Sequence, residues 1–233
     1  MSYFTEVKFD PKAHHYQIRN KSLISATQLI ERLEPEVDWA EKAKGVAIRE
    51  GTTTDLILKK WKDGGLKAAH KGTETHNYIE RVLKYNTEKD TKYPEMLAFH
   101  YFWQNAKEKL TPKKIEWRIG DYDLGIGGTV DCLFDSSITN KAHIFDWKTN
   151  KKFASQNPWQ NLKPPFDDLE DCHLNKYSLQ LSIYKLILRR NTDLVLGNSY
   201  ILWLNSEYTG EFYTKVMALD FTDRVEKWIL ESV

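Results

Sequence analysis

The chain has 233 residues, of which 41% are hydrophobic and 13% aromatic, enough to bury a substantial core and to exclude global disorder. Its 34 Lys and Arg against 33 Asp and Glu give a net charge of +1, which excludes nucleic-acid binding by bulk charge alone but leaves room for a local basic groove. The two cysteines, Cys132 and Cys172, cannot form a four-thiolate zinc or iron–sulfur site and are typical of a reducing compartment.

No targeting or membrane segment is apparent in the sequence. No apolar run approaches the roughly 20 residues that span a bilayer. The opening "MSYFTEVKFDPKAHH" lacks the charged and then apolar layout of a secretory signal. We therefore expect a cytoplasmic protein, of a bacterial or phage-infected host cell, with no membrane partner.

The front of the chain predicts a hairpin followed by helices. "VKFDPKAHHYQIRNKSLI" alternates around a polar turn and is typical of a β-hairpin. "SATQLIERL" then begins a helix, with Ser25 as N-cap and Gln28 as its capping-box partner. Helical periodicity continues through "DLILKKWK" and "GTETHNYIERVLKY", with breaks expected at Gly51 and Gly64–Gly65, and resumes in "YPEMLAFHYFWQNAKEKL".

The rest of the chain predicts a sheet with two further helices. Strand-like runs "KKIEWRI", "DLGIGGTVDCLFD" and "KAHIFDWKT" are separated by Gly, Asp and Asn turn residues. A polar loop, the helix "NKYSLQLSIYKLILRR", the strands "SYILWLN" and "EFYTKVMAL" and a closing helix follow. The pattern predicts an α/β fold with a mixed, mainly antiparallel sheet flanked by helices. We expect one domain over 1–233, with a hairpin and helical front half (1–112) and a sheet core (113–233).

Three charged residues fall within two of these strand-like runs. Asp146 and Lys148 are two residues apart, so their side chains leave the same face of a strand. Asp131 lies in the middle of the preceding run, and a short turn would make the two runs a hairpin. Buried charges are costly unless they pair, bind a metal or do chemistry. The plain alternative is that Asp131 only ends a strand and Lys148 only neutralises Asp146.

Four more residues could join this group. His76 lies on a predicted helix, and an imidazole beside carboxylates suits Mn²⁺ as well as Mg²⁺. Glu116, on the strand before the hairpin, is a further candidate ligand. Gln180 and Tyr184 are four residues apart and face one direction from a helix. Each has a plain alternative: a satisfied helical histidine, an exposed edge-strand acid and a half-buried polar face.

The order of these motifs resembles a known family. The motifs are G-x-x-x-H from Gly72 to His76, G-G-T-V-D ending at Asp131, D-W-K-T from Asp146 to Thr149, and Q-x-x-x-Y from Gln180 to Tyr184. Together they resemble the PD-(D/E)xK nuclease superfamily, and most closely its RecB-like exonuclease branch, which includes phage and mitochondrial genome-maintenance members. A single D-x-K would be a weak signal, but four motifs in this order are specific.

The resemblance implies a restriction-endonuclease-like core and a set of metal ligands. His76, Asp131 and Asp146 would hold one or two Mg²⁺ or Mn²⁺ ions, with the Trp147 carbonyl oxygen as another ligand. Lys148 would lie beside the attacking water. Some relatives carry four cysteines for an iron–sulfur cluster, so this chain is expected to be cluster-free.

The resemblance also implies how DNA would be held. Gln180 and Tyr184 would orient the lysine and contact the strand, and Thr149 is a further candidate contact. Apart from the resemblance, the polar loop that follows mixes cations with aromatic residues, as a groove for single-stranded nucleic acid does, which makes Lys151 and Lys152 candidate DNA contacts. The plain alternative is a solvated loop with a partly packed Trp159. In the resembling exonucleases the helical front half forms an arch over the site, which would require a free end to thread in.

The chemistry of phosphodiester hydrolysis explains why these residue types occur together. A divalent ion neutralises the phosphate and lowers the pKa of a bound water. Lys148 would polarise or deprotonate that water. Since its ammonium would be desolvated and close to a dication, we expect its pKa to be depressed.

The sequence therefore predicts a metal-dependent DNA exonuclease acting on single-stranded or frayed ends in recombination, repair or phage genome processing. One alternative is a nucleic-acid-binding module that recruits a helicase or recombinase as its partner. Another is a metal phosphohydrolase acting on nucleotides, which would need a base-specific pocket.

Overall fold

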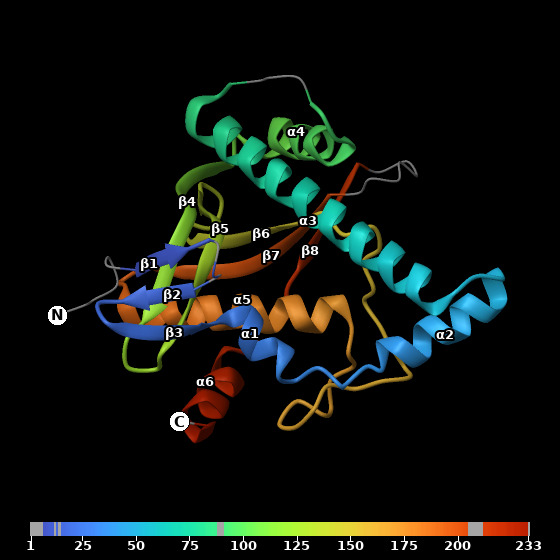
Figure 1. Ribbon diagram of the computed structural model, residues 1–233. Coiled ribbons are helices and arrows are strands. Elements are labelled where there is room, and N and C mark those ends of the chain that lie inside the picture. The colour runs from blue at the N-terminus through green and yellow to red at the C-terminus, as the bar shows by residue number, and fades with distance from the viewer. Residues whose placement is uncertain (1–6, 12, 14, 88–90, 205–211, 233) are drawn as a thin grey trace.

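The computed structural model describes residues 7–11, 13, 15–87, 91–204 and 212–232. It has a mixed α/β fold in which helices flank both faces of an open, mostly antiparallel sheet (Figure 1). The strands are β1 (Val7–Asp10), β2 (His15–Ile18), β3 (Lys21–Ser25), β4 (Leu110–Asp121), β5 (Ile126–Ser136), β6 (Ala142–Lys148), β7 (Leu196–Leu204) and β8 (Tyr213–Met217). The helices are α1 (Ala26–Glu31), α2 (Trp39–Glu50), α3 (Thr54–Tyr85), α4 (Pro94–Ala106), α5 (His173–Asn191) and α6 (Thr222–Ser232).

The sheet joins the front and rear parts of the chain. Its order is β1-β2-β3-β5-β6-β7-β8, with β4 paired to the other edge of β5. Two pairings, β3 with β5 and β6 with β7, are parallel, and the others described are antiparallel. The mainly antiparallel character predicted from the sequence is therefore confirmed. The predicted front and rear halves share this sheet because β3 pairs with β5.

Local signals set most helix ends. The capping box at α1 is present, since the Ser25 hydroxyl accepts from the Gln28 amide and the Gln28 side chain accepts from the Ser25 amide. Gly51 ends α2 in a left-handed conformation with φ 62°. The break predicted at Gly64–Gly65 is wrong, because α3 runs unbroken for 32 residues. A helical glycine costs only about 1 kcal/mol, which the packing of the later turns of α3 offsets.

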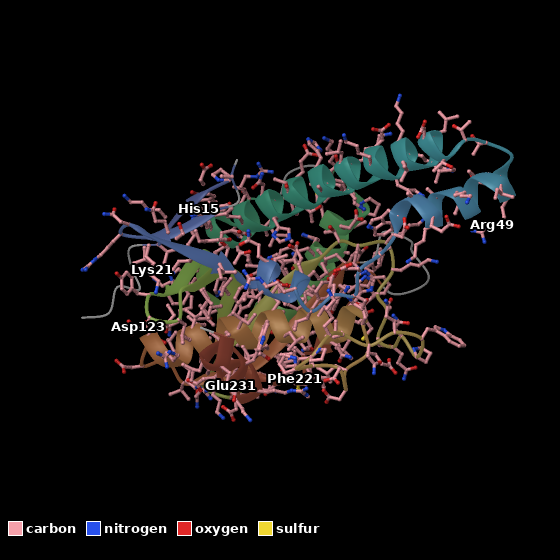
Figure 2. All side chains as sticks on the ribbon, turned by 60° about the horizontal axis from the view of Figure 1, so that its bottom comes forward. His15, Lys21, Arg49, Asp123, Phe221 and Glu231 are labelled. Carbon is pink, nitrogen blue, oxygen red and sulfur yellow. The ribbon has the colours of Figure 1, made fainter. Side chains whose placement is uncertain are left out.

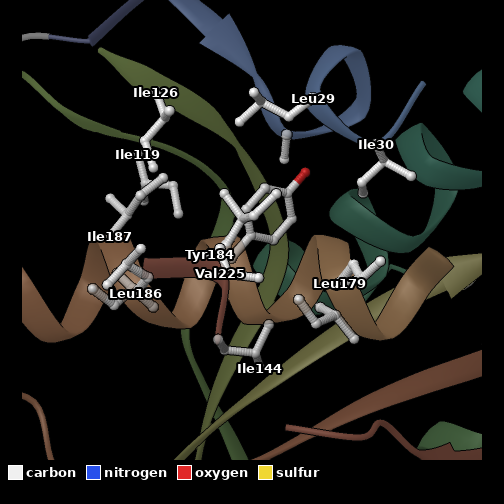
Figure 3. Close-up of a cluster of buried hydrophobic side chains, with 14 of the residues drawn as sticks. Leu29, Ile30, Ile119, Ile126, Ile144, Leu179, Tyr184, Leu186, Ile187 and Val225 are labelled. Carbon is white, nitrogen blue, oxygen red and sulfur yellow. The ribbon is translucent and has the colours of Figure 1, made fainter. Parts of the chain in front are cut away.

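Two hydrophobic layers hold the helices on the sheet. On one face, α1, α5 and α6 enclose Leu179, Tyr184 and Val225, and Figure 3 shows the Tyr184 ring standing on α5 among aliphatic side chains. On the other face, the later turns of α3 and α4 pack on an aromatic cluster that includes Phe99 and Trp147. Each layer fixes one helix that carries candidate site residues, α5 below the sheet and α3 above it.

The α2–α3 hairpin projects from this body. Figure 2 places Arg49 at the far end of the projection, opposite the end of the molecule where His15 and Lys21 lie. A small core that includes Ala43, Ala47 and Ile57 holds the two helices together. None of the helices in the described part of the chain combines the length and apolar character needed to cross a bilayer.

Candidate active site

The site lies where strand β5 changes its partner. One edge of β5 pairs with β3 at Ile126 and Gly127, and with β6 from Cys132 onward. Between these two pairings the strand borders a cavity of about 410 Å³. The cavity is lined by Tyr16, Ser25, Thr27, Ala68, His76, Gly128, Thr129, Asp131, Asp146, Trp147, Lys148, Thr149, Asn150, Tyr177, Gln180 and Tyr184.

Strand register brings three acids together beside this cavity. The β4–β5 pairs Ile115↔Cys132 and Trp117↔Val130 place Glu116 opposite Asp131. The β5–β6 pair Cys132↔Phe145 makes Asp131 and Asp146 the next residues along the two strands. Asp131 and Asp146 are only 7% and 2% exposed, so their charges are removed from water.

Helix α3 adds an imidazole to the acids. His76 Nδ1 lies 3.4 Å from Glu116 Oε1 and 3.6 Å from Asp131 Oδ1. One ligand atom from each of these three residues lies within 4.8 Å of the other two. Glu116 has a φ of 47°, a left-handed conformation that costs a non-glycine residue on the order of 1–3 kcal/mol and that clusters at functional sites. The backbone thus holds the Glu116 carboxylate toward His76 despite the conformational free energy that this φ costs.

Lys148 is fixed from three sides. Its Nζ lies 2.8 Å from Asp146 Oδ2 and donates a hydrogen bond of 3.1 Å to Gln180 Oε1. Nζ also lies 4.4 Å from the centre of the Tyr177 ring. Gln180 Nε2 in turn donates to Tyr184 Oη at 2.8 Å. Lys148 therefore does pair with Asp146, as the plain alternative from the sequence has it. The pair is, however, part of a larger polar network that includes Gln180 and Tyr184.

The charges of the cluster shift its protonation equilibria. Burial alone would lower the pKa of His76, but Asp131 and Glu116 outweigh it and raise that pKa to about 9. Burial raises the pKa of Asp131 to about 7, the His76 charge opposes the rise, and Asp146 and Glu116 add to it. Burial likewise lowers the pKa of Lys148, yet Asp146 and Asp131 reverse the effect and raise it. Without a metal the pKa of Lys148 is thus raised, because two carboxylates lie close by; the depressed pKa expected beside a bound dication stays a prediction.

The donor set fits a hard divalent cation. Mg²⁺ takes carboxylate oxygens and keeps some waters, and an imidazole nitrogen extends the fit to Mn²⁺. Asp146 Oδ2 is buried, and apart from the Lys148 ammonium 2.8 Å away it has no polar partner among the described residues. The Trp147 ring packs 5.4 Å from Phe99 in the aromatic layer, so it is the main chain of Trp147 that borders the cavity. The Trp147 amide donates to Asp131 Oδ2 at 2.7 Å, which orients that carboxylate.

The remaining predicted residues divide into two groups. Thr149 lines the cavity, and its hydroxyl lies so close to α3 that a Cβ at Gly72 would be 3.4 Å from it. Lys151 and Lys152 are exposed and do not line the cavity. Tyr184 lines it but is 4% exposed, so the structure brings it to Gln180 rather than to the surface.

Sequence reasoning missed several lining residues. Tyr177 precedes Gln180 by three residues and Tyr184 by seven, a helical spacing that could have marked it. Tyr16, whose Oη lies 3.0 Å from Thr129 Oγ1, comes from the front hairpin, and no local pattern pointed to it. Tyr16 reaches the site because the front hairpin joins the sheet through β3, which pairs with β5.

Comparisons with known proteins add little. No protein-family model matches the chain, and no curated protein is similar to it. A crystal structure of SSO0001 is similar at 14% identity over 93% of this chain and 79% of that chain, with a TM-score of 0.31. A likeness at this level supports no inference about fold or function.

Proposed function

We propose that this chain is a divalent-metal-dependent DNA exonuclease of the PD-(D/E)xK superfamily, with a restriction-endonuclease-like core of the RecB-like type. The observation that carries the proposal is the convergence of His76, Asp131, Asp146 and Lys148 on one cavity from three separate elements, with Glu116 of a fourth element 3.4 Å from His76. Such a set of acids, imidazole and amine is suited to phosphodiester hydrolysis.

The metal would be Mg²⁺ or Mn²⁺, held by His76, Asp131 and Asp146 with Glu116 as a further ligand and the Trp147 carbonyl oxygen within the same cavity. A bound divalent ion would neutralise the phosphate and lower the pKa of a water. No thiolate lies among these residues, which supports a site without an iron–sulfur cluster.

Lys148 would contribute positive charge at the scissile phosphate. The Gln180 amide and the Tyr177 ring hold its ammonium at the cavity, so it can hydrogen-bond a water or a phosphate oxygen there. Its raised pKa keeps it protonated at neutral pH in the metal-free protein. In the metal-free protein Lys148 is therefore suited to electrostatic stabilisation rather than to a role as a base. A bound divalent ion beside its ammonium would favour the role as a base.

The requirement for a free end is inferred from what surrounds the cavity. Thr27 of α1 and Ala68 and His76 of α3 line it together. The chain between these helices is tied to the loop after β6, since the Lys163 amide donates to the Leu33 carbonyl at 2.7 Å. A strand that enters between α1 and α3 would meet the continuous chain that joins these helices through α2, which favours entry by an end. Lys151 and Lys152 are exposed close along the chain and would contact phosphates outside the cavity.

The test is digestion of end-labelled single-stranded DNA with Mg²⁺ or Mn²⁺, and with EDTA instead. We expect release of mononucleotides or short oligomers only with metal. Lys148→Ala should lower turnover by about 10²–10⁴-fold while DNA binding is retained. The control is Lys227→Ala, an exposed lysine on α6 that should cleave normally. Unchanged turnover in Lys148→Ala would end the assignment of that residue.

A covalently closed single-stranded circle separates the end requirement from the chemistry. We expect the circle to resist digestion until it is linearised, and cleavage of the intact circle would instead indicate an endonuclease. Metal-independent DNA binding without cleavage would favour a module that recruits a helicase or recombinase. Cleavage of free nucleotides in place of DNA would favour a phosphohydrolase.

A further inference from the structure

A second pocket lies on the α4 side of the sheet, away from the candidate active site. It has a volume of about 370 Å³, within the range of small-molecule sites. It lies between the end of α4, the β5–β6 turn and strands β6 to β8. We call it the β6–β8 pocket, defined by Phe102, Lys109, Phe145, Tyr200, Tyr213 and Lys215.

The walls of this pocket are aromatic. The ring of Phe145 lies 4.9 Å from that of Tyr200 and 5.8 Å from that of Phe102. Phe102 meets Tyr213 edge-on at 5.5 Å. Tyr200 and Tyr213 are only half-buried, so part of each ring remains available to a ligand. A planar aromatic group can pack against such a surface.

The rim of the pocket is cationic. Lys109 and Lys215 both line it and are exposed, and no Asp or Glu of the described residues does so. Lys215 Nζ lies 4.9 Å from the Tyr200 ring centre, which sets a positive charge directly beside an aromatic wall. The acid at the nearby turn, Asp135, is already paired with Lys113 at 2.9 Å. An anionic group on a ligand would therefore meet two ammonium groups and no competing carboxylate from the pocket lining.

A neutral histidine and two amides complete the lining. His143 Nδ1 donates to the Asn198 carbonyl at 3.1 Å, and its Nε2 lies 2.8 Å from Thr139 Oγ1. Burial lowers the pKa of His143, and Lys141 and Lys215 lower it further, so the imidazole stays neutral. The exposed Asn105 and Asn198 side chains offer donors and acceptors of the kind that the edge of a base requires.

We propose that the β6–β8 pocket binds a mononucleotide, with its base against the exposed parts of Tyr200 and Tyr213 and its phosphate between Lys109 and Lys215. Aromatic walls, two lysines that form no ion pair with the described residues, and amide side chains in a volume of this size match a planar base joined to an anion. The inference does not depend on cleavage at the other site. Phe145 and Asp146 are adjacent in β6 and point to opposite faces of the sheet, so the two sites do not overlap.

The experiment titrates the protein with each of the common deoxynucleoside 5′-monophosphates by calorimetry, in EDTA so that a metal does not contribute. Deoxyadenosine and inorganic phosphate test the two halves of the ligand separately. We expect saturable binding of at least one mononucleotide, with each half binding more weakly. No saturable binding of any mononucleotide up to millimolar concentration would overturn the proposal.

Variants locate the binding. Lys109→Ala combined with Lys215→Ala should weaken the mononucleotide by about tenfold or more, since two charge-assisted contacts are lost. The matched control combines Lys107→Ala with Lys227→Ala, two exposed lysines outside the pocket, and should bind as the unchanged protein does. Asp146→Asn should also bind normally. Full affinity in the first double variant, or loss of affinity in Asp146→Asn, would place the ligand elsewhere and overturn the proposal.

Discussion

At the scale of single residues, Tyr177 is one of the three contacts that fix the position of Lys148, beside Asp146 and Gln180. The ring face lies under the ammonium at 4.4 Å, and Tyr177 Oη donates to Asn150 Oδ1 at 3.4 Å. A cation over an aromatic face contributes about 0.5–2 kcal/mol. Tyr177 does not reach the carboxylates through a described hydrogen bond, so we regard it as a positioning residue that acts through Lys148.

Tyr177→Leu should therefore lower kcat by about tenfold with little change in KM, because a loss near 1.4 kcal/mol falls on the position of Lys148. Tyr177→Phe keeps the ring and should retain most of the activity. Steady-state kinetics on a labelled oligonucleotide measures both. Equal losses in the two variants would show that the hydroxyl, rather than the ring, matters.

The protonation of Asp131 makes a second prediction at this scale. Its folded pKa of about 7 lies above the ordinary value of 3.8, so the folded state holds a proton that the unfolded chain releases. The free energy of unfolding therefore decreases as pH rises from about 4 to about 7. His76, raised from 6.5 to about 9, extends the decrease to higher pH.

In EDTA, Asp131→Asn should stabilise the protein by about 1–2 kcal/mol near pH 8, as is common when a strained functional group is removed. Near pH 5 the gain should be smaller, since Asp131 is then protonated in the folded state. Urea unfolding at both pH values provides the measurement. A variant that is less stable than the parent near pH 8 would contradict this account of the cluster.

At the scale of elements, the close approach of α5 to β5 depends on a glycine. A Cβ on Gly128 would lie 2.4 Å from Cε1 of Tyr184. The Tyr184 ring is 4% exposed and enclosed by aliphatic side chains, so it cannot move aside (Figure 3). The glycine therefore lets α5 bring Gln180 and Tyr184 up to the cavity.

Gly128→Ala should cost about 1–3 kcal/mol of stability through overpacking. It should also reduce activity, because Tyr184 would lose its hydrogen bond to Gln180. Gly64→Ala in α3 is the matched control: its Cβ would meet nothing within 4 Å, and it should stabilise the helix by about 0.5–1 kcal/mol. Urea unfolding of both variants tests the pair, and a neutral Gly128→Ala would show that α5 can shift.

At the scale of the whole molecule, the site joins elements that are otherwise held by separate layers. α3 packs on the aromatic layer above the sheet and α5 on the aliphatic layer below it. A cation bound between His76 and the strand acids would tie α3 to the sheet. It would also neutralise carboxylates that otherwise repel one another.

Mn²⁺ at about a hundred times its Kd should therefore stabilise the folded state by roughly 2.7 kcal/mol. In a domain of this size that free energy corresponds to a rise in Tm of about 5–10 °C. Asp146→Asn should lose most of this shift, whereas Lys227→Ala should retain it. Thermal scans of the three proteins in EDTA and in Mn²⁺ make the comparison. A shift of equal size in Asp146→Asn would indicate that the ion binds at another place.

The sequence by itself determined the mainly antiparallel α/β pattern, the Ser25 capping box and the side-by-side placement of Asp146 and Lys148, because each follows from interactions within a few residues. It misjudged Gly64–Gly65, since a local helix cost was outweighed by packing farther along α3. Only the tertiary structure decided that Glu116 faces His76, that Tyr16 borders the cavity, and that the carboxylates around Lys148 raise its pKa. These depend on strand register, on the fork at β5 and on the summed charge of residues distant in the chain, none of which is encoded in a short window of sequence.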